Sequence, residues 1–387
     1  MNPSPRVHGR RPLLWTSAIV VPLLAGATVL VPMAANGAVD LPDKTAQELI
    51  TFAGQSDVDA LSGTIEQTSE LGLPDLGAIT GSMGADSSGE GASAAEIDDL
   101  ISLITGSHTA KVYLDGDSSR LQVLDRLGER NIYVDGDARQ VWYVDSESRS
   151  ATKLVLPSEE DISAAYGDDV APSVPGESAA TPDEMLDQAL ARLDESTDVT
   201  VGTDARVAGR EVYELILAPR TDDTLVGKLR FAIDGETGVA LAASVSARGA
   251  TSPAFEIAFT QVDFAAPDAS VFAFEPGADI TVTEEDVPLP SKGVQDDMSA
   301  KPDAATPVVI GEGWSAVVEL PVSSEAGGED VFAGLDPEQS AMLDSVTTAV
   351  DGGRLLQTSL VSVLITDDGR VLAGAVPAAL LVDAAGR

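Results

Sequence analysis

The most constraining feature of the sequence is strand-like alternation across residues 225–274. Apolar side chains recur at every second position around 229–233, 241–245 and 255–259, a period typical of β-strands with one buried face. The intervening Asp-Gly-Glu-Thr-Gly at 234–238 is rich in residues that tolerate positive φ and predicts a hairpin turn. The region therefore predicts three consecutive antiparallel strands that present one broad apolar face.

The same alternation extends through much of the chain. It predicts a strand at 61–66, a meander of short hairpins over 109–156, and strands at 198–207 and 211–218, which gives about eleven strands. Helices are expected at 44–55, 95–105 and 182–195, and the first and last begin with capping-box spacing, Thr45 to Glu48 and Thr181 to Glu184. The apolar stripe of the helix at 182–195 must lie on an apolar surface, and the sheet is the candidate.

The C-terminal part of the strand pattern resembles a known superfamily. An apolar strand, the segment Ile-Asp-Gly-Glu-Thr-Gly at 233–238, a second apolar strand, a Phe-rich strand and the exit at 266–276 resemble the last three strands of the LolA-like lipoprotein-carrier superfamily. That group includes LolA-type carriers, RseB-type sensors of envelope stress and LppX-type lipid carriers. The resemblance covers about residues 40–280. It implies an α+β fold, in which a strongly bent antiparallel half-barrel of about eleven strands has its concave face plugged by helices.

Composition shifts divide the chain into four segments. Residues 1–38 contain Arg10-Arg11, an uncharged apolar stretch and small residues at 35–38, which predicts a signal peptide or an N-terminal membrane anchor. We expect residues 39–275 to form the LolA-like half-barrel domain, 276–307 a Pro/Asp-rich linker, and 308–387 a small C-terminal α+β appendage. In the appendage the pattern predicts a strand at 314–320, a helix at about 337–350, paired strands at 355–365 and 370–376, and a short C-terminal helix. The expected location is extracytoplasmic, either secreted or anchored to the cytoplasmic membrane.

The charge and the missing residue types exclude several functions. The formal net charge is -40, which disfavours binding to nucleic acid. The chain contains no cysteine and only two histidines, of which His108 alone lies outside the targeting segment. His108 follows Ser107, but no G-x-S-x-G elbow occurs, and an exposed or turn histidine is the better explanation. No Cys/His metal cluster or P-loop is present. Residues 311–316 match a dinucleotide fingerprint loosely but precede a strand rather than a helix. The Asp-Gly-Asp segments are better explained as hairpin turns than as calcium loops. We therefore expect no enzyme activity, no cofactor and no metal.

The one feature that suggests a function is the amount of apolar strand surface relative to the few helices that could cover it. The plain interpretation is an ordinary core. The alternative is a pocket for acyl chains, in which each buried methylene contributes about 0.8 kcal/mol whatever the headgroup. The side chains predicted to line it are Val112, Leu114, Leu121, Val123, Val141, Tyr143, Leu215, Leu217, Phe231, Ile233, Val245, Phe255, Ile257 and Phe259.

The sequence thus favours an exported carrier that holds the acyl chains of a lipid or lipoprotein. The resemblance implies a loading partner in the membrane, such as an ABC-type transporter, and an acceptor in the envelope. A second hypothesis is an RseB-like sensor or regulatory module that binds the extracytoplasmic segment of a membrane protein. A third, least favoured, is an enzyme that acts on envelope polymers.

Overall fold

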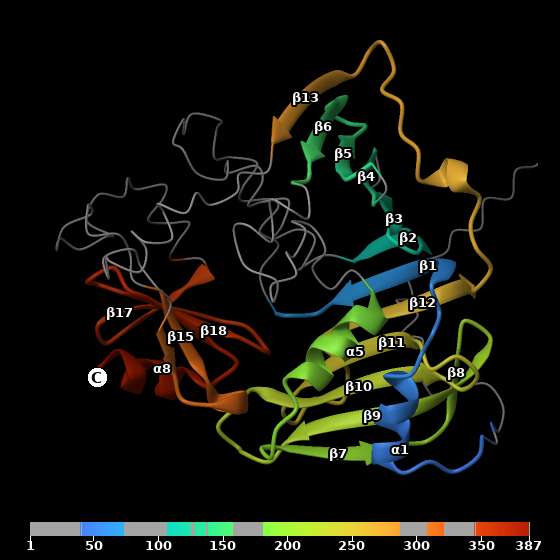
Figure 1. Ribbon diagram of the computed structural model, residues 1–387. Helices are drawn as coiled ribbons and strands as arrows, with labels where there is room; N and C mark the ends of the chain where they lie inside the picture. Colours follow the sequence, from blue (N-terminus) through green and yellow to red (C-terminus); the bar gives the residue numbers. More distant parts are fainter. Residues whose placement is uncertain are drawn as a thin grey trace, which may run out of the picture.

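The computed structural model describes residues 39, 41–72, 107–124, 128–136, 138–157, 181–286, 308–320, 344 and 346–386. Within these residues the chain forms two β-sheets, one of thirteen strands and one of six, with a few short helices (Figure 1). The fold is α+β, as the sequence predicts. The large sheet is strongly curved.

The large sheet has the strand order β13-β6-β5-β4-β3-β2-β1-β12-β11-β10-β9-β7, with β8 also paired to β9. Neighbouring strands are antiparallel except for β13 and β6, which are parallel. Its strands are β1 (Ala60–Ser69), β2 (His108–Asp115), β3 (Ser118–Leu124), β4 (Glu129–Asp135), β5 (Gln140–Asp145), β6 (Ser150–Val155), β7 (Thr197–Val201), β8 (Ala205–Val207), β9 (Arg210–Pro219), β10 (Val226–Asp234), β11 (Ala240–Ala247), β12 (Phe255–Asp263) and β13 (Thr281–Asp286).

The sheet changes direction where β1 meets β12, and Figure 1 shows the two parts on either side at different tilts. The pairing register shifts between Thr64 and Ile65, which leaves a bulge in β12. Beside this bulge, Gly63 has no room for a side chain, because a Cβ there would lie 2.5 Å from the carbonyl oxygen of Gln261 and 2.6 Å from the ring of Phe259. Bulge and glycine together allow the bend.

Two helices pack on one side of the sheet. Helix α1 (Ala46–Ala53) and helix α5 (Pro182–Ala191) both begin with the predicted capping boxes and are shorter than the ranges expected from the sequence. Helix α1 contacts β7 and β9, and α5 lies on β11 (Figure 1). Leu49 of α1 and Leu186 of α5 are 0% and 1% exposed, so their apolar faces are buried in the core of the sheet.

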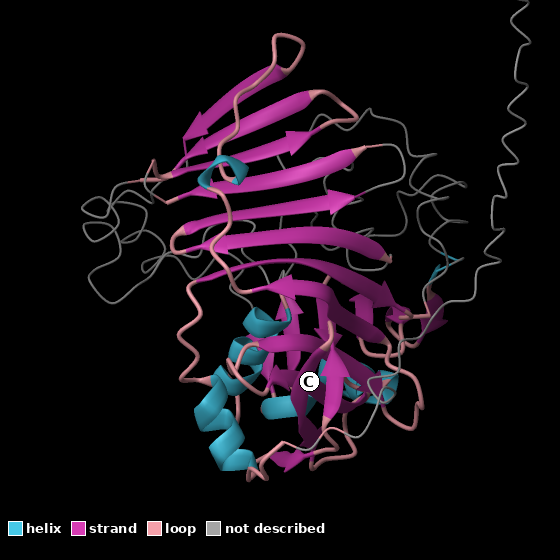
Figure 2. Ribbon diagram, turned by 90° about the vertical axis from the view of Figure 1, so that its right-hand side faces the viewer, coloured by secondary structure: helices cyan, strands magenta, loops and turns pink. Residues whose placement is uncertain are grey.

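Residues 264–280, called the strap below, cross the opposite side of β2–β6 and end in β13 at the edge strand β6 (Figure 2). The strap includes one turn of 3-10 helix, η1 (Ala269–Val271). Residues 276–307 were predicted as a linker, but β13 lies within that range and belongs to the sheet. Together with the division of the strand expected at 198–207 into β7 and β8, it accounts for thirteen strands instead of about eleven.

The second sheet is formed within residues 308–320 and 346–386, which we call the C-terminal domain, and has the order β14-β15-β19-β18-β17-β16. Helix α8 (Ala378–Ala385) packs on β18 and β19 around Leu364, Leu372 and Leu381. The remaining elements are β14 (Val308–Ile310), the 3-10 turn η2 (Gly313–Ser315), β15 (Val317–Leu320), β16 (Thr348–Val350), β17 (Gly353–Gln357), β18 (Ser362–Thr366) and β19 (Val371–Gly374).

Some expected elements differ from the structure or lie beyond it. A single strand was expected over 355–365, but the chain turns at 358–361 and forms β17 and β18. The helix expected at 337–350 ends in a strand, β16, and most of its range lies outside the described residues. The N-terminal segment 1–38, the helix expected at 95–105 and residues 287–307 also lie outside them. None of the helices described here has the length and apolar character needed to span a bilayer.

The C-terminal domain is docked against the end of β10–β12. Val226, Ala254 and Leu360 form a buried apolar cluster at the junction, packed against Leu71 and Trp314 among others. Main-chain hydrogen bonds reinforce the contact. The amide of Leu225 donates to the carbonyl of Ala375 at 2.7 Å, and the amide of Ser359 donates to that of Leu71 at 2.9 Å.

Candidate ligand-binding face

Every side chain predicted to line a pocket lies on one face of the large sheet, called the inner face. The cross-strand pairs Val112–Leu121, Leu215–Phe231 and Ile257–Ala243 follow from the observed register, and paired residues project to the same side of a sheet. Because the register of β1 with both β2 and β12 connects the two parts, this face is continuous across the bend. The lipid-binding role of these residues stays a prediction.

The inner face of β9–β12 is covered by the chain's own helices. Leu215, Leu217, Phe231 and Ile233 are at most 1% exposed. They share one core cluster with Leu49 and Leu186 from the two helices, together with Ile257 and Phe259 from β12. In this arrangement these side chains pack against the chain's own helices. Here the plain interpretation, an ordinary core, describes the structure.

The inner face of β2–β6 is less completely covered. Leu114 and Leu121 are only partly buried, and so is Tyr143. Val112, Val123 and Val141 are buried between them. Helices α1 and α5 make their main contacts with β7, β9 and β11 rather than with these strands. This part of the inner face therefore combines buried apolar side chains with partly exposed ones.

Three further apolar side chains belong to the same surface. Ile132 is paired with both Leu121 and Tyr143, and Val134 is paired with Val141, which in turn pairs with Leu154. All three additional residues are partly exposed. Their alternation along β4 and β6 is the signal that identifies them, and it is the same signal that identified the others. We call the partly exposed set the open face: Leu114, Leu121, Ile132, Val134, Tyr143 and Leu154.

Val245 and Phe255 lie where the inner face meets the C-terminal domain. Both are partly buried, and both pack in the junction cluster with Leu360 of the C-terminal domain. Phe255 also belongs to the core beneath the helices. The C-terminal domain therefore touches the inner face directly at the ends of β11 and β12.

The outer face of β2–β6 is closed by the strap. Tyr113, Arg120, Tyr133, Trp142 and Lys153 form one cross-strand row. The ring of Phe274 from the strap lies 5.3 Å from that of Tyr133 and 5.2 Å from that of Trp142.

Arg120 connects this row to the strap. Its guanidinium stacks over Tyr133 at 4.7 Å and donates to Asn131 Oδ1 at 2.8 Å and to the carbonyl of Val271 at 3.4 Å. Burial raises the pKa of Tyr133, and the neighbouring Arg120 opposes that shift. Since the strap occupies the outer side, the inner face is the side of β2–β6 on which apolar surface remains.

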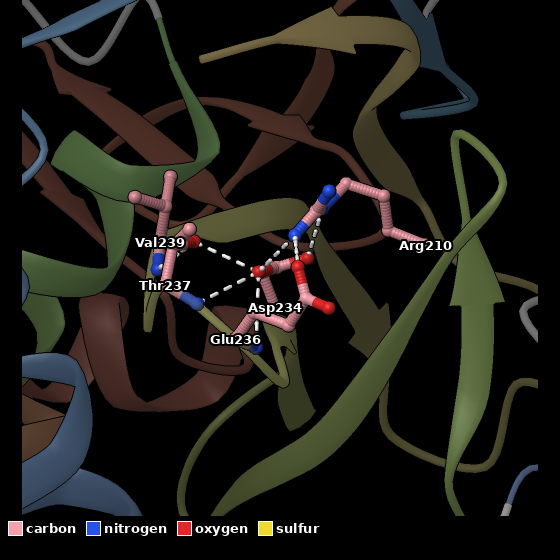
Figure 3. Close-up of polar contacts among 5 residues, drawn as sticks. All are labelled: Arg210, Asp234, Glu236, Thr237 and Val239. Atoms are coloured by element: carbon pink, nitrogen blue, oxygen red, sulfur yellow. Dashed lines mark hydrogen bonds and ion pairs between the residues drawn. The ribbon is translucent and has the colours of Figure 1, made fainter.

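The 234–238 segment is held by a buried ion pair. Arg210 Nε donates to Asp234 Oδ2 at 2.5 Å and its terminal nitrogen to Glu236 at 2.7 Å, while Asp234 Oδ1 accepts from the amide and hydroxyl of Thr237 (Figure 3). Burial raises the pKa of Asp234, but the hydrogen bonds from Arg210 and Thr237 outweigh burial and hold it below its usual value. Arg210 also lies over the ring of Phe264, where the strap begins. The cluster joins three elements and is structural.

Two other carboxyl groups have shifted pKa values. Asp183 at the start of α5 accepts a hydrogen bond from the amide of Ala240 at 2.7 Å. Its burial raises its pKa against the effect of that hydrogen bond, and the nearby Asp187 raises it further. Burial also raises the pKa of Glu256 on β12. No cluster of three metal-ligating side chains occurs among the residues that the structure describes.

Comparison with protein-family models and with curated protein sequences finds no match. Solved structures do match. The complex of Pseudomonas aeruginosa MucB with MucA is 15% identical over 87% of this chain and 96% of that chain, with a TM-score of 0.41. A LolA superfamily protein from Nitrosomonas europaea is 11% identical over 60% of this chain and 99% of that chain, with a TM-score of 0.22. A putative outer membrane lipoprotein-sorting protein domain from Vibrio parahaemolyticus is 11% identical over 59% of this chain and 97% of that chain, with a TM-score of 0.23.

The sequence resembles the LolA-like superfamily, and a LolA superfamily protein and a lipoprotein-sorting protein domain are among the solved structures that match. With identities below 25% and TM-scores below 0.5, these matches are similarities and assign no function. What the chain binds must be argued from its own residues.

Proposed function

We propose that this protein is an exported carrier that binds the acyl chains of a lipid or lipoprotein on its open face. The observation that carries the proposal is the contrast in burial along one continuous apolar face. Beneath the helices Leu215, Leu217, Phe231 and Ile233 are at most 1% exposed, whereas the side chains of the open face keep part of their surface accessible. Transfer of a hydrocarbon chain from water onto such a surface is favourable by about 25 cal/mol per Å² buried.

The chemistry of the open face suits a carrier. Its six members are aliphatic except for Tyr143, so they offer contact area and few hydrogen bonds. Binding would then depend on chain length more than on headgroup, and a partly exposed site can also release its ligand. A transporter in the membrane would load the carrier, and an acceptor in the envelope would receive the ligand. The proposal requires no catalytic group, cofactor or metal.

The test is to purify the full chain from its native compartment and identify extracted lipids by mass spectrometry. Binding of a fluorescent palmitic acid analogue is then compared between the natural protein and the double variant Leu121→Gln, Leu154→Gln. We expect bound lipid and about tenfold weaker probe binding in the double variant, because two apolar contacts are replaced by polar ones. The matched control is Val361→Gln, a 40% exposed apolar side chain of the C-terminal domain, which should leave binding unchanged.

A lipid-free protein that also fails to bind the probe would overturn the carrier function. Equal weakening in the control variant would overturn the assignment of the open face.

The second candidate is a regulatory module that binds an extracytoplasmic segment of a membrane protein. The docking of the C-terminal domain supports it, because the buried cluster around Leu360 and the hydrogen bonds to Ala375 and Leu71 fix two folded units relative to each other. A fixed pair of domains offers an extended surface to a polypeptide. Crosslinking in intact membranes separates the candidates, since one stoichiometric protein partner in the absence of bound lipid would favour the regulator.

A further inference from the structure

The turn that follows α5 is contacted by the C-terminal domain. After Ala191 the chain turns through residues 192–196 and enters β7 at Thr197. Asp194 closes this turn by accepting hydrogen bonds from the amide and hydroxyl of Ser196, at 2.8 and 2.5 Å. Because so few residues separate the helix from the strand, the position of Thr197 limits where the last turn of α5 can lie.

Trp314 of the C-terminal domain makes the polar contact with this turn. Its indole Nε1 donates to Thr197 Oγ1 at 2.8 Å, and Thr197 is only 7% exposed. The preceding Gly313 has φ +56° and lies so close to the turn that a Cβ would be 2.8 Å from Ser196 Oγ. The loose dinucleotide motif at 311–316 thus has a structural explanation, because Gly313 brings the main chain close to the turn after α5.

The C-terminal domain has other contacts with the sheet that do not involve α5. The hydroxyl of Thr224 and the amide of Leu225 both donate to the carbonyl of Ala375 at 2.7 Å. Leu360 is buried against Val226 and Ala254. These contacts hold the domain in place independently, so it can serve as a fixed support for the indole of Trp314.

Helix α5 is therefore held at both ends. Asp183 attaches its first turn to the amide of Ala240 in β11, and Trp314 holds the turn after its last residue through Thr197. Between these points Leu186 covers the inner face of the sheet. We propose that Trp314 is a positioning residue through which the C-terminal domain keeps α5 seated, and so sets how much of the inner face is available to a ligand. The ligand part of this inference rests on the proposed carrier function.

The test separates the hydrogen bond from the stability of the interface. Trp314→Phe keeps an aromatic ring and removes the N–H donor, and Thr197→Val keeps the shape and removes the acceptor. Hydrogen exchange of peptides spanning 182–196, followed by mass spectrometry on the full chain, should accelerate about threefold to tenfold in each variant. The double variant should accelerate no more than either single one, since both remove the same bond.

The matched control is Val361→Gln, a 40% exposed side chain of the C-terminal domain that lies outside the junction cluster. It should leave exchange of peptides spanning 182–196 unchanged. Unchanged exchange of α5 in Trp314→Phe and Thr197→Val, or an equal increase in Val361→Gln, would overturn the inference.

Binding of the palmitic acid analogue tests the link to the ligand. Tighter or additional probe binding in Trp314→Phe supports it, whereas faster exchange of α5 with unchanged probe binding overturns it. A natural protein that binds no probe overturns the carrier function instead, and the hydrogen-exchange result would still decide whether Trp314 holds the helix.

Discussion

The two parts of the inner face have the same sequence pattern and different surroundings. In β9–β12 the alternating apolar residues are buried under α1 and α5, and Phe231 is 1% exposed. In β2–β6 the equivalent positions, such as Leu121, stay partly exposed. Alternation specifies which face of a strand is apolar, but elements from elsewhere in the chain decide whether that face becomes core or binding surface. Three predictions test this difference, from the largest expected effect to the smallest.

Paired truncations should have opposite consequences in the two parts. Phe231→Ala should lower the free energy of unfolding by about 3–5 kcal/mol, because it opens a cavity in a closed core. Leu121→Ala should lower it by only about 1 kcal/mol, since the side chain is already partly exposed, yet it should weaken binding of the acyl probe. Urea unfolding and probe titration measure the two effects. Equal losses of stability would mean that β2–β6 is as closed as β9–β12.

The ion pair between Arg210 and Asp234 at the end of β10 should stabilise mainly β9–β12, the part of the sheet that the helices cover. At neutral pH, Asp234→Asn should cost about 2–3 kcal/mol, less than for a fully buried pair because the Arg210 side chain keeps 27% exposure. The pKa of Asp234 is lowered on folding, so its contribution is present above the unfolded pKa of about 3.9 and is lost as pH falls through the folded value. The difference in free energy of unfolding between Asp234→Asn and the natural protein should therefore become smaller at acid pH.

Hydrogen exchange should locate this effect. Asp234→Asn should accelerate exchange in β9–β11 and leave the amides of β3–β6 unchanged. Uniform acceleration across the sheet would show that the two parts unfold as one unit and would contradict the comparison.

The smallest effect is expected at the start of α5. Burial raises the folded pKa of Asp183, so the contribution of this group is present below the unfolded pKa and is lost as pH rises through the folded value. Asp183→Asn cannot ionise, and its amide oxygen can still accept from Ala240. Relative to the natural protein the variant should therefore gain stability as pH rises from about 3 to 7, by less than about 1 kcal/mol. Thermal unfolding of both proteins across this pH range measures the trend. A variant that loses stability relative to the natural protein as pH rises would contradict it.

Much of the fold could be predicted from the alternation and the capping boxes. They identify β10–β12, the meander β2–β6 and the starts of α1 and α5, and the pairing register places the predicted lining residues on one face. Strand β13 was missed because Thr281–Asp286 is mostly polar and its first four residues are exposed, so it carries no apolar period. The break between β7 and β8 was missed because both segments pair with the same strand, β9.

The limits of the candidate site could not be predicted from local pattern. Nothing in the period of β9 or β10 distinguishes a strand under a helix from a strand beside a ligand. The contact between Trp314 and Thr197 joins residues far apart in the sequence, as does that between Leu360 and Val226. Such contacts depend on how the two domains pack together. The apolar pattern of a single strand carries no information about that packing.

The parallel placement of β13 on β6 has a consequence for the order in which the protein is built. Until the chain has been made as far as Asp286, the backbone of β6 faces solvent with unsatisfied amides and carbonyls, and such an edge invites pairing with other chains. The free edge of β6 in the meander therefore stays exposed while more than a hundred further residues are synthesised. Once the strap closes over Trp142, β13 occupies that edge, so the final step of assembly also ends the period of greatest risk of aggregation.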